Sequence, residues 1–240
     1  MAKKHGKRYS GLQDSVDPEA FYSPEEAISW VKKGASAKFN ETVEFHLRLN
    51  LDARQADQQV RGVVVLPHGL GKKLSVVVFA TGEGEKIASD AGADFVGSDE
   101  LIKKVNAGWT DFDVALATPD MMTKIGKLGR VLGRKGLMPS PRTGTVVNSN
   151  DLARAVEQSK AGRVEYRLDK FGIIHTVIGK SQFEEQQLVD NFTALMEAIL
   201  EARPDGIKGG YIKSLSLSST MGPGIKIDLS ALLQMEGAAN

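Results

Sequence analysis

The sequence predicts an α/β protein of two domains, in which a discontinuous α+β domain formed by both ends of the chain carries an inserted α/β domain. Residues 40–50 and 211–220 alternate apolar and polar side chains, as strands with one exposed face do. Residues 74–117 instead contain short apolar runs separated by helical stretches, which is typical of parallel βαβ units. The 240 residues, 41% of them hydrophobic, are enough for two cores. We place the first domain at 1–67 plus 160–240 and the inserted domain at 68–159.

The amino-terminal part of the first domain is expected to contain one helix and two strands. Ser23 has the hydroxyl of a helix N-cap, Pro24 suits the first helical position, and Glu26 is placed to close a capping box. The alternation over 40–50 predicts a half-buried strand, and the more apolar run at 60–66 predicts a second strand.

The inserted domain is expected to have three short strands, at 74–80, 93–96 and 113–117. Asp99 is placed to cap the helix that follows the second of these strands. The pattern closes near Ser159, where antiparallel features return.

The carboxyl-terminal part should begin with a hairpin formed by strands at 163–168 and 173–178. A long helix with one apolar stripe should start at Ser181 and Glu184 and end at 204–206. The final strand is the alternating run named above.

Composition excludes several classes of site. Cysteine is absent, which removes disulfides, thiolate metal sites and cysteine nucleophiles, and fits a reducing compartment such as the cytoplasm. The basic start lacks the apolar core of a signal peptide, so neither export nor a membrane span is expected. The four histidines are scattered without carboxylates at metal-ligand spacing, so no metal is expected.

The net charge of +1 gives no general attraction to a polyanion, so only local basic clusters can supply one. One cluster, with no acid in its segment, comprises Lys124, Lys127, Arg130, Arg134, Lys135 and Arg142. A second cluster comprises Lys3, Lys4, Lys7 and Arg8. Such clusters are compatible with nucleic-acid contacts, although charge runs are more often solvated surface.

The most informative segment is 218–224, where hydroxyl residues at a strand end precede a bend with two glycines. Hydroxyls and exposed backbone N–H groups suit ribose and phosphate oxygens, and the segment contains no acid, base or nucleophile. An ordinary strand end with a turn explains the same residues. The segment therefore favours a contact surface over a catalytic site.

Two other functions stay open from the residues alone. Gly69 to Lys73 lacks Walker spacing and is interpreted as a turn, while the glycines from Gly126 to Gly136 form either a phosphate-approaching loop or a plain surface loop. An enzyme that binds a nucleotide at either segment has no identifiable catalytic set, so we predict no enzyme and no cofactor. A protein-binding module using the helical stripe 188–200 is the second alternative.

Several motifs occur in order along nearly the whole chain. They are 39–44 (FNETVE), 60–62 (VRG), 66–72 (LPHGLGK), 111–113 (DFD), 137–139 (LMP), 144–146 (GTV) and 220–223 (TMGP). With these motifs the chain resembles the bacterial family of large-subunit ribosomal protein number one, the protein of the mobile stalk beside the tRNA exit site. Where that family usually has Asn-Pro-Lys, this chain has Ser140-Pro141-Arg142, which keeps the positive charge.

The resemblance implies a split α+β domain with a Rossmann-like, three-layer α/β insertion. It also implies a cytoplasmic, ribosome-associated protein, monomeric when free, that binds the stalk region of large-subunit rRNA mainly through its first domain. Assistance in the release of deacylated tRNA from the exit site, and repression of its own operon through the mRNA leader, are implied as well. The RNA contacts implied residue by residue are Lys38, Phe39, Thr42, Glu44, His175, Ser218, Thr220, Met221 and Gly222, with Arg54 and Lys180 as additions.

This interpretation requires the strand ends at Thr42 and Thr220 to lie side by side. RNA in A-form hides its base edges in a deep groove, so a protein contacts its shape, 2′-hydroxyls and irregular backbone. The hydroxyls of Thr42, Ser218 and Thr220 suit such contacts. We therefore expect Thr220→Val to weaken rRNA binding while leaving the fold intact.

Overall fold

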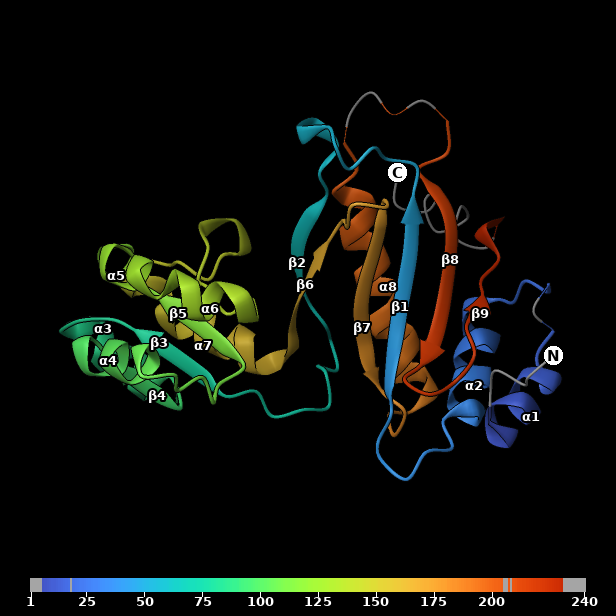
Figure 1. Cartoon of the computed structure of the whole chain (residues 1–240), viewed down its shortest axis with the longest axis horizontal. Helices are drawn as coiled ribbons and strands as arrows, with labels where there is room; N and C mark the ends of the chain where they lie inside the picture. The colour runs from blue at the N-terminus through green and yellow to red at the C-terminus, as the bar shows by residue number, and fades with distance from the viewer. Residues whose placement is uncertain (1–5, 18, 205–206, 208, 231–240) are drawn as a thin grey trace. The chain divides into compact units, whose positions relative to one another are not determined.

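The computed structural model describes residues 6–17, 19–204, 207 and 209–230 and has a mixed α/β fold (Figure 1). The chain divides into two compact units, Met1–Gly71 with Val164–Asn240, and Lys72–Arg163. Each crossing therefore lies four residues beyond the expected boundary, at 71 instead of 67 and at 163 instead of 159. Residues 68–71 therefore belong to the first unit. The side chain of Asn191 holds His68 and Gly69 there, because it accepts the His68 N–H and donates to the Gly69 carbonyl.

The first unit contains an antiparallel sheet in the order β7-β1-β8-β9 and a separate two-stranded sheet, β2-β6. Its helices are α1 (Lys7–Ser15), α2 (Pro24–Gly34) and α8 (Glu185–Glu201), with a 3-10 turn at Ala56–Gln58. Its strands are β1 (Thr42–Leu49), β2 (Arg61–Val65), β6 (Arg163–Arg167), β7 (Ile173–Lys180), β8 (Ile212–Ser219) and β9 (Ile225–Lys226).

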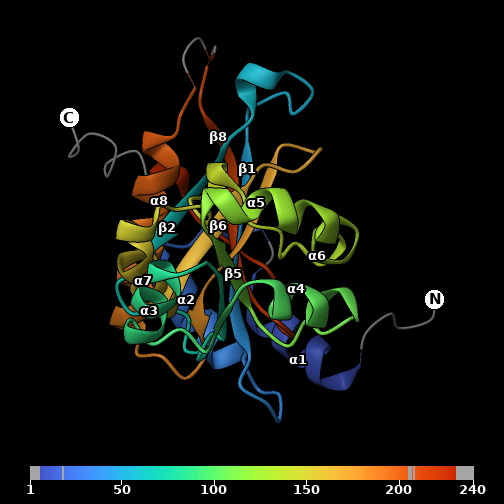
Figure 2. The ribbon, with the colours of Figure 1, turned by 90° about the vertical axis from the view of Figure 1, so that its left-hand side faces the viewer.

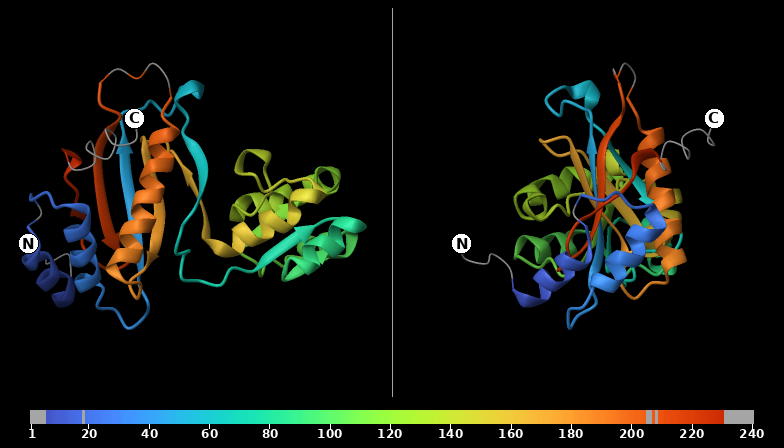
Figure 3. Two further views of the ribbon diagram at one scale, coloured as in Figure 1. Left: turned by 180° about the vertical axis from the view of Figure 1, so that it is seen from behind. Right: turned by 90° about the vertical axis from the view of Figure 1, so that its right-hand side faces the viewer.

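Helices α2 and α8 pack against one face of the four-stranded sheet (Figure 3). Val43, Phe45, Leu47 and Leu49 of β1 are buried in the core on that side, which confirms the predicted alternation. The polar residues between them point to the opposite face of the sheet. The sheet thus presents a polar face on a rigid support.

The helix starts follow the expected capping chemistry with one correction. Ser23 and Glu26 form the predicted capping box of α2. Helix α8 is capped by Glu184 with Gln187, and Ser181 instead donates its backbone N–H to the Glu41 carbonyl. Its last residue is Glu201; of the expected stop at 204–206, residues 205 and 206 lie outside the described residues.

The predicted hairpin of 163–168 and 173–178 is wrong, because its two strands belong to different sheets. Strand β6 pairs with β2, and β7 pairs with β1. The turn itself forms, with the Asp169 carboxylate accepting the backbone N–H groups of Phe171 and Ile173. An isolated bridge between Leu168 and Ile174 and the hydrogen bond from the Asp169 N–H to the Ile173 carbonyl link the two sides of the turn.

The inserted unit has a parallel sheet in the order β4-β3-β5. Figure 2 shows this unit with helices on both sides of β5. Its strands are β3 (Val76–Phe79), β4 (Phe95–Gly97) and β5 (Val114–Ala117). Its helices are α3 (Glu83–Asp90), α4 (Asp99–Asn106), α5 (Pro119–Ile125), α6 (Gly129–Lys135) and α7 (Leu152–Gly162). One core joins the sheet to α3 and α7, and another joins it to α4, α5 and α6. This is the expected three-layer, Rossmann-like arrangement.

Asp99 does not cap α4 as predicted. It is the first helical residue, after Ser98 at the N-cap position. Its carboxylate instead accepts two hydrogen bonds from Lys124 Nζ, at 2.8 and 3.0 Å, which lowers the pKa of Asp99.

Candidate nucleic-acid interface

The start of β1 and the end of β8 lie side by side, as the RNA-binding interpretation requires. Val43 pairs with Ser219 in the antiparallel register. Beyond that pair, the Thr220 N–H donates to the Thr42 carbonyl at 3.1 Å, and the Thr42 N–H donates to Thr220 Oγ1 at 3.0 Å. Segments 178 residues apart in the sequence therefore form one continuous edge.

Strand β7 adds Lys180 to this edge through a β-bulge. The register shifts between Val43, opposite Gly179, and Glu44, opposite Val177. This shift places Lys180 opposite Thr42, and Lys180 Nζ donates to Thr42 Oγ1 at 2.7 Å. The bulge thus brings a cation beside the hydroxyl that the sequence singled out.

The bend after β8 and the loop before β1 complete the surface with two exposed apolar side chains. Phe39 is 53% exposed and Met221 is 48% exposed. A Cβ added to Gly222 would lie 2.5 Å from Ser219 Oγ, so any other residue there would have to displace the Ser219 hydroxyl. We call the following set the strand-end patch: Lys38, Phe39, Thr42, Glu44, Lys180, Ser218, Thr220, Met221 and Gly222.

Glu41 is the residue in this region that sequence reasoning missed. It is fully buried, and its two carboxylate oxygens accept the N–H groups of Ala37 at 2.8 Å and Met221 at 2.9 Å. Burial alone would raise the pKa of Glu41, but these backbone hydrogen bonds, together with the Ser219 hydroxyl and the charge of Arg8, hold the pKa below its usual value. The alternation of buried and exposed residues could have indicated this burial. Position 41 lies two residues before Val43 and four before Phe45, so its side chain faces the same apolar side.

His175 lies on the same polar face, farther along the strands. It is opposite His46, and the two Nδ1 atoms are 2.9 Å apart. His46 Nε2 is 3.3 Å from Ser218 Oγ and 3.6 Å from the Glu44 carboxylate. The histidine pair is therefore continuous with the strand-end patch through Ser218.

His46 gives the first unit a pH dependence whose sign follows from its environment. Burial lowers the pKa of His46, the nearby His175 lowers it further, and Glu44 opposes both effects. The unfolded chain then takes up this proton more readily than the folded one, so stability falls as pH drops below the ordinary histidine value of about 6.5. We expect the free energy of unfolding to decrease between about pH 6.5 and 5, and His46→Gln to flatten this decrease. Denaturant titrations at several pH values provide the measurement, and identical pH profiles for both proteins would contradict it.

Arg54 is not part of the strand-end patch. It follows the far end of β1, where its N–H donates to the Asp52 carboxylate. The eight residues of β1 separate this end from Thr42 by roughly 24 Å. A contact by Arg54 would involve a different part of the RNA.

The two glycine segments form no phosphate loop. At the Gly69 segment, Lys72 pairs with Asp113 at 2.5 Å. The residues from Gly126 to Lys135 are helical, and Gly136 is the left-handed C-cap of α6. The alternative of a nucleotide-binding enzyme therefore loses support. The alternative of a protein-binding module loses support as well, because the apolar stripe of α8 is largely buried in the core of its own unit.

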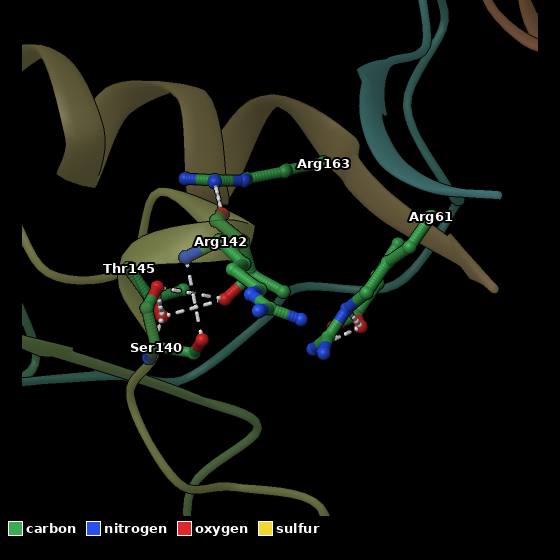
Figure 4. A network of polar contacts seen from close by, with 7 residues as sticks. Arg61, Ser140, Arg142, Thr145 and Arg163 are labelled. Atoms are coloured by element: carbon green, nitrogen blue, oxygen red, sulfur yellow. Dashed lines mark hydrogen bonds and ion pairs between the residues drawn. The ribbon is translucent and has the colours of Figure 1, made fainter. Parts of the chain in front are cut away.

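Part of the basic cluster at 124–142 is already engaged within the inserted unit. Lys124 pairs with Asp99, and Lys135 Nζ bonds to Thr110. The exposed Arg142 sits in a turn in which Ser140 Oγ accepts the Arg142 N–H at 3.3 Å (Figure 4). Ser140 thus makes the side-chain-to-backbone bond that an Asn at this position can also make.

Two classes of site are missing from the part of the chain that the structure describes. No three His, Asp or Glu side chains there are grouped so that they could hold a metal ion. Nor does any helix there have the length and apolar character needed to span a bilayer. Lys3 and Lys4 of the amino-terminal cluster lie outside the described residues.

Comparisons with known proteins agree on one family. Residues 31–223 match the model of the Ribosomal protein L1p/L10e family. Relatives named "Large ribosomal subunit protein uL1" include one from Dehalococcoides mccartyi strain BAV1, 55% identical over 97% of this chain and 98% of its own length. Another, from Chloroflexus aggregans, is 54% identical over 97% of this chain and 99% of its own. The chain therefore belongs to the Ribosomal protein L1p/L10e family, whose members are structural ribosomal proteins and not enzymes.

Proposed function

We propose that this chain is a cytoplasmic protein of the large ribosomal subunit that binds the stalk region of large-subunit rRNA through the strand-end patch. The observation that carries the proposal is the junction of Thr42, Thr220 and Lys180 at one edge of the sheet. The names of the relatives support the assignment to the large subunit.

The chemistry of the patch suits folded RNA better than it suits a regular duplex. Threonine and serine hydroxyls can bond to ribose and phosphate oxygens, and the exposed rings and thioether offer surface to unstacked bases. Lys38 and Lys180 are its two cations, while Glu44 is an anion at its border. Binding should therefore depend on shape complementarity more than on bulk charge.

We further propose two roles that rest on the family resemblance. A fold in the leader of its own operon mRNA that mimics the rRNA site would occupy the same patch, so the protein would repress its own synthesis. On the ribosome, the rRNA stalk and the protein would move with departing tRNA and assist its release. Both roles need only a monomer when free, since a single sheet carries the patch.

Thr220→Val tests the proposed rRNA contact. Thr220 Oγ1 already accepts the Thr42 N–H, so valine removes an internal bond as well as a hydroxyl available to RNA. One exposed hydrogen bond is worth about 0.5–1.5 kcal/mol, so the variant should fold and lose roughly threefold to tenfold in affinity for a stalk-type rRNA fragment.

Thr220→Ser is the matched control, because it keeps the hydroxyl and should bind like the parent protein. Filter-binding titrations measure both variants, with ATP as a competitor that should not displace the RNA. Unchanged affinity of the valine variant would contradict a role for this hydroxyl in RNA binding.

A further inference from the structure

We infer that Glu41 is a positioning residue for RNA binding: its buried carboxylate fixes the two segments that present Phe39 and Met221. The inference rests on the proposed rRNA-binding function. Glu41 itself offers nothing to RNA, since none of its surface is exposed. Its effect must therefore pass through the groups that it holds.

The two oxygens of the Glu41 carboxylate accept hydrogen bonds from two different segments. Oε1 accepts the Ala37 N–H at 2.8 Å, inside the loop that carries Lys38 and Phe39. Oε2 accepts the Met221 N–H at 2.9 Å, at the bend that follows β8. A single side chain thus sets the separation between loop and bend, across 184 residues of sequence from Ala37 to Met221.

Charge makes these bonds strong and their loss costly. A carboxylate that accepts backbone N–H groups forms bonds about twice as strong as neutral ones. The pKa of Glu41 is lowered despite burial, so the side chain is ionised at neutral pH and available to accept both bonds. The Arg8 guanidinium lies 4.0 Å from Oε1 and is partly exposed, so it compensates the buried charge only weakly.

The backbone of Glu41 contacts the third segment of the patch, the end of β7. Its carbonyl accepts the Ser181 N–H at 2.9 Å, directly after Lys180. Glu41 therefore contacts all three segments of the strand-end patch, two through its side chain and one through its main chain. A site built from loops must be held to a fraction of an ångström to match a rigid partner, which is the role that we assign to this carboxylate.

Glu41→Gln and Glu41→Ala separate positioning from simple stability. Glutamine keeps the size but has one acceptor oxygen, and its NH₂ group faces the second backbone donor. We expect affinity for the rRNA fragment to fall about threefold to tenfold for Gln and more than tenfold for Ala. Arg8→Ala should stay within about twofold of the parent, and Glu197→Gln, an exposed carboxylate on α8, is the matched control.

The decisive readout combines affinity with amide hydrogen exchange measured by NMR on the full chain. Faster exchange at Ala37 and Met221 in the folded Gln variant, together with weaker RNA binding, is the expected result. Unchanged exchange, or faster exchange with unchanged affinity, would overturn the inference. If the parent protein itself fails to bind the RNA, the proposed function is wrong, and the exchange rates alone then decide whether Glu41 positions the two segments.

Discussion

Replacing Gly179 by alanine should destabilise the first unit by about 2–4 kcal/mol, because a side chain at this position would strain the backbone and clash with its neighbours. Gly179 has a φ of +154°, which residues with a side chain rarely adopt. An added Cβ would lie 2.8 Å from Leu188 Cδ2 and 2.9 Å from Phe183 Cδ2. The substitution should also disturb the bulge that places Lys180 opposite Thr42, so rRNA affinity should fall together with stability.

The two tryptophans make this measurement specific to one unit. Trp30 belongs to the first unit and Trp109 to the inserted unit, so denaturation followed by fluorescence in a Trp109→Phe background reports the first unit alone. Gly11→Ala is the control, because Gly11 is helical with open space around it and alanine should raise stability slightly. A Gly179→Ala loss below about 0.5 kcal/mol would show that the bulge tolerates a side chain.

Phe39→Ala should reduce affinity for the rRNA fragment roughly tenfold or more, and Met221→Ala should reduce it less. A base stacked on an aromatic ring contributes about 1–3 kcal/mol, whereas the flexible thioether of methionine offers a less defined surface. Both side chains are about half exposed, so their removal should leave stability within about 0.5 kcal/mol of the parent.

Phe171→Ala is the matched control for Phe39→Ala. Phe171 is also an exposed phenylalanine of the first unit, but it lies in the turn before β7, at the opposite end of the sheet from the strand-end patch. Titration of both variants against the same RNA distinguishes a local contact from a general loss of apolar surface. Equal losses for the two variants would argue against the proposed location.

Local pattern predicted most of the elements and failed where pairing depends on distant residues. The alternation in β1 and the capping box of α2 depend only on residues close together in the sequence, and the predictions of both are confirmed. The hairpin prediction failed because a short turn between two strands does not decide which partners each strand takes. The side chain of Asn191, which moves the first boundary, acts across more than a hundred residues.

The same distinction applies to the candidate site. Resemblance supplied the residue types of the strand-end patch, and the required contact between Thr42 and Thr220 follows from the sheet register. The bulge at Gly179 and the two bonds of the Glu41 carboxylate needed coordinates, because no spacing rule predicts a partner from another segment. Arg54 shows the converse, since family correspondence groups it with residues that lie a full strand length away.

We propose that RNA occupies the strand-end patch. Titration of the ¹⁵N-labelled full chain with a stalk-type rRNA fragment tests it most directly by NMR. The largest amide shifts should occur at Phe39, Thr42 and the segment 218–222, with small changes around the basic residues 124–142. Shifts concentrated at 124–142, with the signals of 218–222 unmoved, would contradict it.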